Sequence, residues 1–345
     1  MEVLLRIYLF CVPGDPLSLK WPATYTQGMG SDDYWYYQHL WWDRTFFDKK
    51  PSAPTSASNK DFYAHWAASL ELDPVLGYKR KANVTFPGHE TSNLGTRGKR
   101  QYALGGEKIV FYGDSFVESN APSENTLTAK MEKQSGIDCL NYGVGGYGLD
   151  QIYLLFEQTH KQFDPARTRC LIGVFGEDLQ RMLLAVRQSA KPYFTVEDSR
   201  LVLHTGHIDA TNPKRFFETY KPHFRLFLGR FVVHKIKPLD DYFVARHQRQ
   251  EDARIKRLTS LLIERFKQSN VKIRFVLFSD WRNEVLRAEL KRQEVPLIDV
   301  ELFVREYIAK TGISQPKFFP AGHPSPELNE AIAGFILEQM GVPRR

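Results

Sequence analysis

The sequence predicts an α/β protein, a three-layer α/β/α sandwich built around a mostly parallel sheet. From residue 108 onward, apolar segments of strand length alternate with segments whose apolar residues recur at helical spacing. The clearest strand is 108–112, where four consecutive apolar residues suit a strand buried on both faces. Because parallel strands need crossover connections, helices are expected on both faces of the sheet.

The same alternation places the remaining elements in order. After the first strand, further strands are predicted at 137–142, 170–175, 271–278 and 295–298. The helix that follows the first strand is expected to have Ser123 as its N-cap and to stop at Gly136. Later helices are predicted at 149–163, 178–188, 252–268, up to about Arg292, 301–311 and 326–340.

Two regions stand outside this alternation. Residues 1–100 are rich in aromatic and turn residues and show little periodicity, which predicts an irregular extension packed on the core. The main α/β domain is expected at 101–345, with an insertion at about 187–250 that interleaves aromatic and basic residues. This insertion is expected to form a cap region that closes over a substrate or binds an anionic one, and a purely structural cap or an oligomer contact remains open.

The charge and cysteine content narrow the function classes. The net charge is +7, but the basic residues are scattered among acidic ones, which indicates a solvated surface. No segment resembles a nucleic-acid-binding module, so no nucleic-acid partner is expected. Three cysteines, Cys11, Cys139 and Cys170, form no metal-ligand spacing, and their odd number argues against a disulfide framework. No metal ion or organic cofactor is implied.

The N-terminal apolar run bears on localisation. It extends from Val3 to Val12, is interrupted by Arg6 and lacks a small-residue cleavage site. No stretch is long enough to span a membrane. The chain as written is therefore expected to be cytoplasmic, and a start site further upstream would instead allow a periplasmic or membrane-associated protein.

Four short blocks follow strands or precede the last helix. They are Gly113-Asp114-Ser115, the glycine-rich stretch from Asn141 to Gly148, Gly176-Glu177-Asp178, and Gly322-His323 with the Pro-Ser-Pro that follows. In order and spacing these blocks resemble the SGNH hydrolases, the GDSL-type esterase and lipase superfamily. The resemblance covers 101–345 apart from the insertion. The segments 73–78 and 93–97 also resemble a lead-in found before the first block in some bacterial members.

The resemblance implies roles for individual residues. Ser115 matches the nucleophile and His323 the general base. The backbone amides of Ser115 and Gly146 match donors to the oxyanion that forms during acyl transfer. From the residues alone, the first block is also an ordinary strand-ending turn, and the glycines also serve simply to shape a loop.

Two positions depart from the family pattern. Glu177 stands where the family usually has an asparagine that donates to the oxyanion, and an ionised carboxylate donates nothing. Pro320 and Ala321 stand where an acid usually precedes the histidine. Asp178 is one candidate to orient His323, and Glu177, Asp280 and Asp299 are others. A Ser-His dyad, a triad with a displaced acid and a decayed catalytic site all remain open.

The predicted function is a serine esterase or acyltransferase that acts on a small O-acyl ester. O-acetyl groups on a carbohydrate are the substrate class that the resemblance suggests. The alternative is a catalytically silent glycan-binding protein with the same fold. Lipid hydrolysis is disfavoured because no segment resembles an interfacial amphipathic helix. The sequence indicates no oligomeric state.

Overall fold

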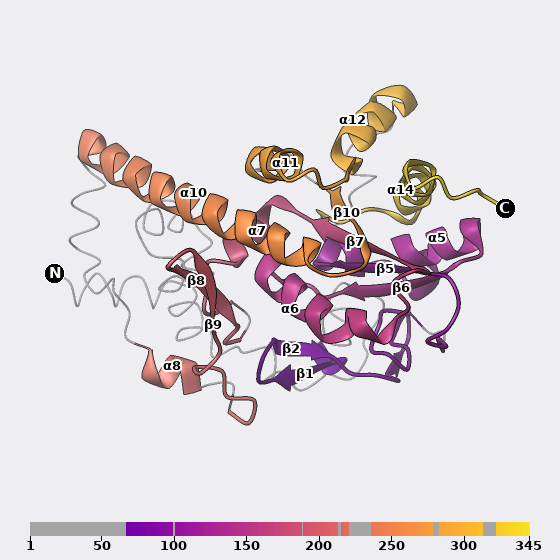
Figure 1. The fold of residues 1–345 in the computed structure, drawn as a ribbon, viewed down its shortest axis with the longest axis horizontal. Coiled ribbons are helices and arrows are strands. Elements are labelled where there is room, and N and C mark those ends of the chain that lie inside the picture. The colour runs from indigo at the N-terminus through magenta and orange to yellow at the C-terminus, as the bar shows by residue number, and fades with distance from the viewer. Residues whose placement is uncertain are drawn as a thin grey trace, which may run out of the picture.

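A five-stranded parallel sheet forms the centre of the computed structural model, which describes residues 67–98, 101–187, 189–212, 215–220, 236–278, 283–312 and 322–345 (Figure 1). From one edge to the other, the strand order is β11, β10, β7, β5, β6, and every neighbouring pair is parallel. The strands are β5 (Lys108–Gly113), β6 (Asp138–Gly143), β7 (Thr168–Val174), β10 (Lys272–Leu277) and β11 (Leu297–Asp299). The predicted parallel sheet is confirmed.

Helices cover both faces of the sheet, which confirms the three-layer prediction (Figure 1). One face packs against α6 (Leu149–Thr159), α10 (Lys237–Lys267) and α11 (Asn283–Arg292). The other packs against α5 (Leu127–Ser135), α12 (Val300–Thr311) and α14 (Pro326–Gln339). Strand β5 shows the cause, because Val110 and Tyr112 point into the first layer while Ile109 and Phe111 point into the second.

Several helix boundaries differ from the sequence-based prediction. Ser123 lies in a short 3-10 turn, η3 (Ser123–Asn125), and Thr126 caps α5 by accepting from the Ala129 amide at 3.3 Å. The predicted N-cap was therefore wrong, whereas Gly136 ends the helix as predicted, at a left-handed φ of 71°. The helix predicted at 178–188 is the shorter α7 (Gly176–Arg181), and α10 begins well before residue 252.

The described part of the N-terminal extension, 67–98, is more regular than expected. It contains two antiparallel pairs, β1 (Leu70–Asp73) with β2 (Gly77–Arg80) and β3 (Thr85–Phe86) with β4 (His89–Glu90). Leu76 and Tyr78 are buried in the hydrophobic cluster of the α6 face. The aromatic-rich segments between residues 34 and 47 lie outside the described residues.

The same extension closes the β6 edge of the sheet. Arg97 forms an antiparallel bridge with Asn141 of β6, and its amide donates to the Asn141 carbonyl at 2.8 Å. The Arg97 guanidinium is buried and donates to the Gly88 and Ala121 carbonyls at 2.8 and 2.9 Å. It also donates to the Ser123 hydroxyl at 2.6 Å. Backbone and side chain of one residue thus attach the extension to the main domain.

The predicted insertion contributes a hairpin and part of a long helix. Strands β8 (Tyr193–Glu197) and β9 (Arg200–His204) pair antiparallel beneath α10, and α8 (Arg215–Thr219) follows (Figure 1). Phe194 of the hairpin packs on Tyr153 of α6 with ring centroids 6.3 Å apart. The hairpin is therefore anchored to the helical layer that covers the sheet.

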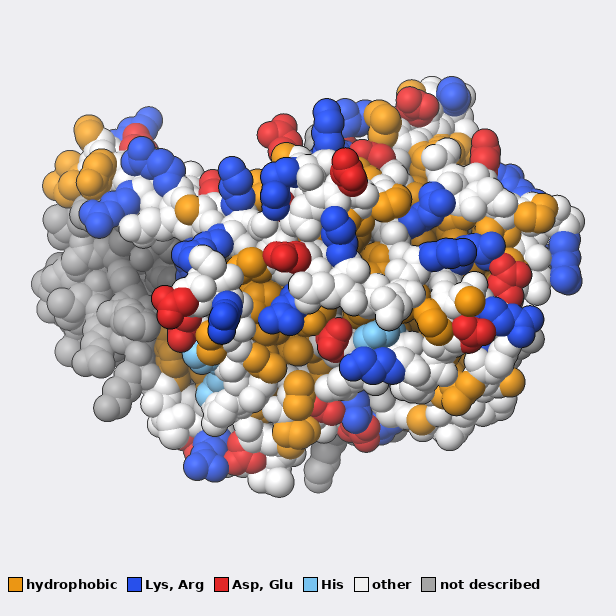
Figure 2. All heavy atoms as spheres, in the orientation of Figure 1, with side chains coloured by type: hydrophobic (Ala, Val, Ile, Leu, Met, Phe, Trp, Pro, Cys, Tyr) orange, Lys and Arg blue, Asp and Glu red, His pale blue; other side chains and the backbone are white. Residues whose placement is uncertain are grey.

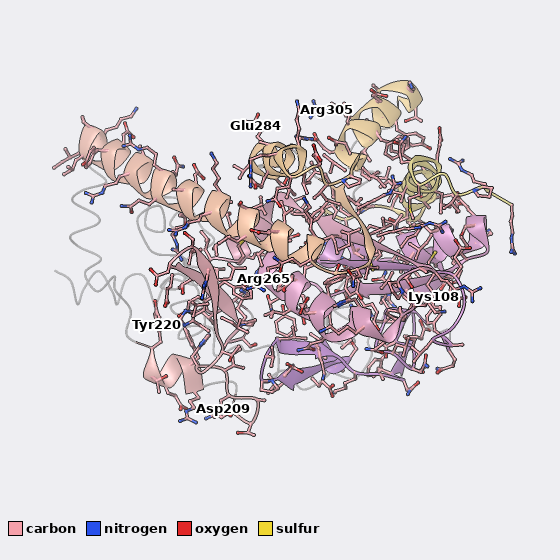
Figure 3. All side chains as sticks on the ribbon, in the orientation of Figure 1. Lys108, Asp209, Tyr220, Arg265, Glu284 and Arg305 are labelled. Atoms are coloured by element: carbon pink, nitrogen blue, oxygen red, sulfur yellow. The ribbon has the colours of Figure 1, made fainter. Side chains whose placement is uncertain are left out.

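Charged side chains of both signs are interspersed over the face of the molecule that Figure 2 shows. Asp209 in the insertion, for example, pairs with Arg215 at 3.0 Å (Figure 3). Such mixing fits the solvated surface that the sequence indicated. In the described parts of the chain, no helix has the length and apolar character needed to cross a bilayer.

The amino edge of the sheet carries a buried cation. Lys108 opens β5, and Figure 3 shows it at the end of the strand away from the Ser115 turn. Its ammonium group pairs with Asp138 of β6 at 3.1 Å, which compensates the cost of burying it. The two strands are thereby held in register at the edge opposite their carboxyl ends.

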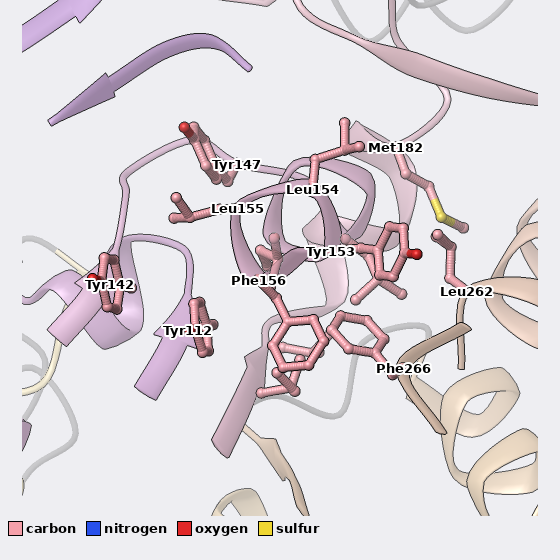
Figure 4. Close-up of a cluster of buried hydrophobic side chains, with 14 of the residues drawn as sticks. Tyr112, Tyr142, Tyr147, Tyr153, Leu154, Leu155, Phe156, Met182, Leu262 and Phe266 are labelled. Carbon is pink, nitrogen blue, oxygen red and sulfur yellow. The ribbon is translucent and has the colours of Figure 1, made fainter. Parts of the chain in front are cut away.

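Aromatic side chains dominate the core on the α6 and α10 face (Figure 4). Phe156 of α6 lies edge-on to Tyr112 of β5 at 5.4 Å and packs on Phe266 of α10 at 5.2 Å. It also stacks on His160 at 4.3 Å. One side chain of α6 thus contacts both the sheet and α10.

Replacing Phe156 with alanine is expected to lower the free energy of unfolding by about 3–5 kcal/mol, because a large fully buried ring is removed and leaves a cavity. Denaturant titration followed by circular dichroism measures the change. Leu302→Ala on α12 is the control, since that side chain is 51% exposed and should cost less than about 0.5 kcal/mol. Equal losses in the two variants would contradict this account of the core.

Candidate active site

Three of the four sequence blocks meet at the carboxyl edge of the sheet. Strands β5, β6 and β7 are neighbours, and Gly113 at the end of β5 pairs in register with Gly143 at the end of β6. Ser115, Gly146 and Glu177 come two or three residues after these three strand ends. Ligands of open α/β sheets bind at this edge, so the blocks lie where the fold favours a site.

Ser115 is the first residue of a short helix, α4 (Ser115–Glu118), that turns sharply away from β5. Asp114 caps the helix by accepting from the Phe116 amide at 2.9 Å. The turn needs glycine at 113, because a Cβ there would lie 2.3 Å from Val117 Cγ2. The Ser115 hydroxyl is half-buried and lies 3.4 Å from Asp114 Oδ2. The sequence thus places a hydroxyl on a tight strand-to-helix turn.

The glycine-rich loop after β6 lies directly against this helix. A Cβ on Gly143 would lie 2.2 Å from the Glu118 amide nitrogen, so the two backbones are in contact. Gly146 has a φ of +85°, which favours glycine. Within the described residues, the amides of Ser115 and Gly146 have no hydrogen-bond acceptor. Both amides are therefore available to a ligand, as oxyanion donors must be.

A buried ion pair holds the glycine loop against α4. Glu118 accepts from the Gly145 amide and pairs with Arg80 of β2, and both side chains are 2% exposed. Arg80 Nε donates to the Gly143 carbonyl at 3.1 Å. Sequence reasoning missed both charged residues. The available signal was the lead-in at 73–78, which runs from the last residue of β1 through the turn into β2, the strand that ends with Arg80.

Tyrosines of the lead-in and of the loop add to this support. The Tyr78 hydroxyl donates to the Gly145 carbonyl at 2.9 Å. The Tyr147 hydroxyl donates to the Tyr78 carbonyl, and the two rings meet edge-on at 5.4 Å. Burial raises the pKa of both hydroxyls far above the usual range, so they remain hydrogen-bond donors at any working pH.

Glu177 is paired with arginines. Its Oε2 accepts from Arg181 Nη2 at 2.6 Å, and Arg187 Nη2 lies 3.7 Å away. Arg187 also donates to the Gly146 carbonyl at 3.3 Å, which links this carboxylate to the glycine loop. The Glu177 side chain is 46% exposed. Its charge is therefore compensated by two cations and by solvent.

Asp178 lies beneath the Ser115 turn rather than beside His323. Its carboxylate accepts from the Phe175 amide at 2.8 Å and from Arg181 Nη1 at 2.7 Å. Arg181 Nη1 also donates to Asp114 Oδ2 at 2.9 Å. Burial and then the Asp114 charge raise the pKa of Asp178 well above its usual range, since one guanidinium serves both carboxylates. Among the described residues, no hydrogen bond joins Asp178 to His323.

The other acids considered from the sequence are placed as follows. Asp299 accepts from the Leu302 amide as the N-cap of α12 and pairs with Arg287 at 2.9 Å. Asp280 lies outside the described residues, as do Pro320 and Ala321. Asp299 therefore serves the start of a helix and forms an ion pair with α11.

The fourth block lies far from the first in the sequence but contacts it in the structure. His323 lies just before α14, and its ring is 5.3 Å from that of Phe116, the residue after Ser115. His323 Nδ1 lies 3.0 Å from Asn120 Nδ2, a contact between residues 203 positions apart. Within the described residues, Ser115 and His323 form no direct hydrogen bond in this unliganded state. His323 is held near Ser115 by its contacts with Phe116 and Asn120.

A separate open cavity of about 610 Å³ lies beside α5, away from these residues. Its lining mixes acidic and basic side chains, including Glu132, Lys133 and Arg345. Ser115, Gly146 and His323 do not line it. In the described residues, no group of three or more His, Cys, Asp or Glu side chains is suited to hold a metal ion. The carboxyl edge of the sheet therefore remains the candidate site.

No family model matches the sequence, and no curated protein matches it. Solved structures that resemble the chain include a lipolytic G-D-S-L family member from Veillonella parvula, at 12% identity and a TM-score of 0.40, covering 67% of this chain and 97% of that one. Another is a mutant of the acetylxylan esterase Axe2 from Geobacillus stearothermophilus, at 13% identity and a TM-score of 0.37. The match covers 69% of this chain and 97% of that one. A third is the hydrolase LAE5 from the metagenome of Lake Arreo, at 12% identity and a TM-score of 0.39. The match covers 70% of this chain and 97% of that one. The sequence blocks indicated proteins of this kind.

Replacing Glu118 with glutamine is expected to lower the free energy of unfolding by about 3–5 kcal/mol, because the Arg80 guanidinium is left buried without its counter-charge. Arg80→Met should cost a similar amount. The double variant should cost less than the two single losses together, since neither charge then remains unpaired. Denaturant titration measures all three, and strictly additive losses would show that the two side chains do not act as a pair.

Proposed function

We propose that this protein is an SGNH-type serine esterase or acyltransferase that acts on a small O-acyl ester. The observation that carries the proposal is the position of His323. A segment far along the chain brings this histidine onto Phe116, the residue next to Ser115 at the start of α4. The adjoining glycine loop offers a backbone amide at Gly146, at the same edge of the sheet. A nucleophile, a base and oxyanion donors are the components that acyl transfer needs.

The proposed reaction has two halves. His323 takes the proton from the Ser115 hydroxyl as Oγ bonds to the ester carbonyl carbon, and the amides of Ser115 and Gly146 stabilise the resulting oxyanion. The intermediate then expels the alcohol, which receives the proton from His323, and leaves an acyl group on Ser115. Water or a sugar hydroxyl attacks this acyl-enzyme with His323 again as base, which yields a free acid or a new ester and restores Ser115.

The substrate class within this proposal is an O-acyl group, with O-acetyl on a carbohydrate as the preferred case. This choice follows the sequence resemblance to SGNH hydrolases. A single observation favours the second candidate, a silent glycan-binding protein of the same fold. Glu177 replaces the asparagine that would donate to the oxyanion, and its oxygen is bound to Arg181. Turnover separates the two candidates.

A serine-directed fluorophosphonate is expected to label the wild-type protein at Ser115, and a short-chain aryl ester should be hydrolysed. Ser115→Ala should abolish labelling and turnover, and His323→Ala should lower turnover by at least about a thousandfold, because nucleophile and base act as a unit. Peptide mapping and initial rates measure both effects. Cys139→Ala, at a buried position in β6, is the matched control and should retain activity. Full turnover in Ser115→Ala would identify a different nucleophile.

Glu177→Gln is expected to raise kcat by roughly tenfold or more. The change keeps the side-chain shape, removes the negative charge and supplies an amide donor of the kind whose loss costs about 2.7–4 kcal/mol elsewhere. Ester hydrolysis from about pH 5 to 9 measures the effect. Glu338→Gln near the C-terminus, whose side chain is 71% exposed, is the matched control and should leave kcat unchanged. A strong decrease in the Glu177 variant would show that the carboxylate itself is required.

A further inference from the structure

His323 needs a specific tautomer to act as a base. If Nε2 is to accept the Ser115 proton, Nδ1 must carry a hydrogen and donate it to a fixed acceptor. SGNH sequences usually supply this acceptor as an acid shortly before the histidine, and this chain does not. Asp178 is engaged by Arg181 and the Phe175 amide, and Asp299 serves α12. Among the described residues, neither of these two carboxylates makes a hydrogen bond to His323.

The side chain that lies at Nδ1 is Asn120. The amide and ring nitrogens are 3.0 Å apart, within hydrogen-bond distance. A rotation of the amide by 180° exchanges its nitrogen and oxygen and places Oδ1 where it accepts the Nδ1 hydrogen. In the described residues, the Asn120 side chain makes no other hydrogen bond, so this rotation breaks none there. The productive tautomer and this amide orientation stabilise each other.

The residue before Asn120 is hydrogen-bonded to α14, the helix that follows His323. Ser119 ends α4 at a φ of 67°, an uncommon conformation for a residue other than glycine. Its hydroxyl accepts from the Ala121 amide at 3.2 Å and from Asn329 Nδ2 of α14 at 3.3 Å. Ser119 and Asn329 are both fully buried. The turn that presents Asn120 is therefore tied to α14, whose N-terminus follows His323.

We propose that Asn120 is the positioning residue that orients His323, in place of the acid that SGNH sequences usually carry shortly before the histidine. The inference rests on the proposed function. The catalytic set is then Ser115, His323 and a neutral amide. An amide holds the ring and selects the tautomer, but it stabilises the imidazolium less than a carboxylate does, because it brings no charge. The proposed arrangement therefore fixes the geometry of the ring without placing a charge beside it.

The central test compares Asn120→Ala, which removes the acceptor, with Asn120→Asp, which keeps the shape and adds a charge. Asn120→Ala should lower kcat by about 10- to 100-fold with KM nearly unchanged, a loss within the range of one general-base contribution. Asn120→Asp should preserve or raise kcat and move the acidic limb of the pH–rate profile up by about one unit. Asn270→Ala and Asn270→Asp, at an exposed position after α10, should change neither quantity.

Nitrogen-15 NMR of the imidazole gives a readout that needs no turnover. Wild type should show His323 protonated at Nδ1 when neutral, and Asn120→Ala should shift the signal toward the Nε2-protonated form, with His323→Ala identifying the resonance. Folding of each variant is checked by its melting temperature. Turnover that depends on Ser115 but is unaffected by both Asn120 changes, or a wild-type His323 protonated at Nε2, overturns the role of Asn120. Absence of turnover with the expected NMR shift would reject the esterase function and retain the orienting contact.

Discussion

The buried pairing of Arg80 with Glu118 is the interaction on which the site depends. Glu118 belongs to the helix that carries Ser115, and its carboxylate also accepts from the Gly145 amide of the neighbouring loop. A carboxylate in this position is tolerated only because a guanidinium compensates it. The turn that carries Ser115, the glycine loop and the β1–β2 hairpin are thereby held together. Preorganisation of this kind is what an oxyanion site requires.

A second arginine, Arg181, connects the Ser115 turn to α7. Arg181 of α7 contacts Asp114, Asp178 and Glu177, which come from two of the four sequence blocks. The acidic residues of these blocks are therefore engaged in structure, which is why none of them is seen beside His323. A cation shared among several carboxylates fixes the turn that presents Ser115. The same arrangement leaves the orientation of the histidine to a neutral side chain.

The sequence predicted the sheet well because each parallel strand has a mostly apolar centre, and because parallel strands bring their carboxyl ends to one edge. It could not choose between Ser123 and Thr126 as the cap of α5, since two hydroxyl residues three positions apart carry similar local signals. The contact of Asn120 with His323 also could not be predicted from the sequence. It spans 203 positions and depends on the backbone conformation of Ser119, which no local pattern encodes.

The bridge between Arg97 and Asn141 has a consequence for how the chain folds. It covers the β6 edge of the sheet, where unpaired backbone groups would otherwise invite pairing with another chain. A fragment that begins at residue 101 would expose that edge and leave the Glu118 carboxylate buried without Arg80. Loss of this one segment would then cause both self-association through the exposed edge and displacement of the glycine loop. Within the described residues, one segment, 67–98, therefore supplies both a backbone partner for the β6 edge and the counter-charge for Glu118.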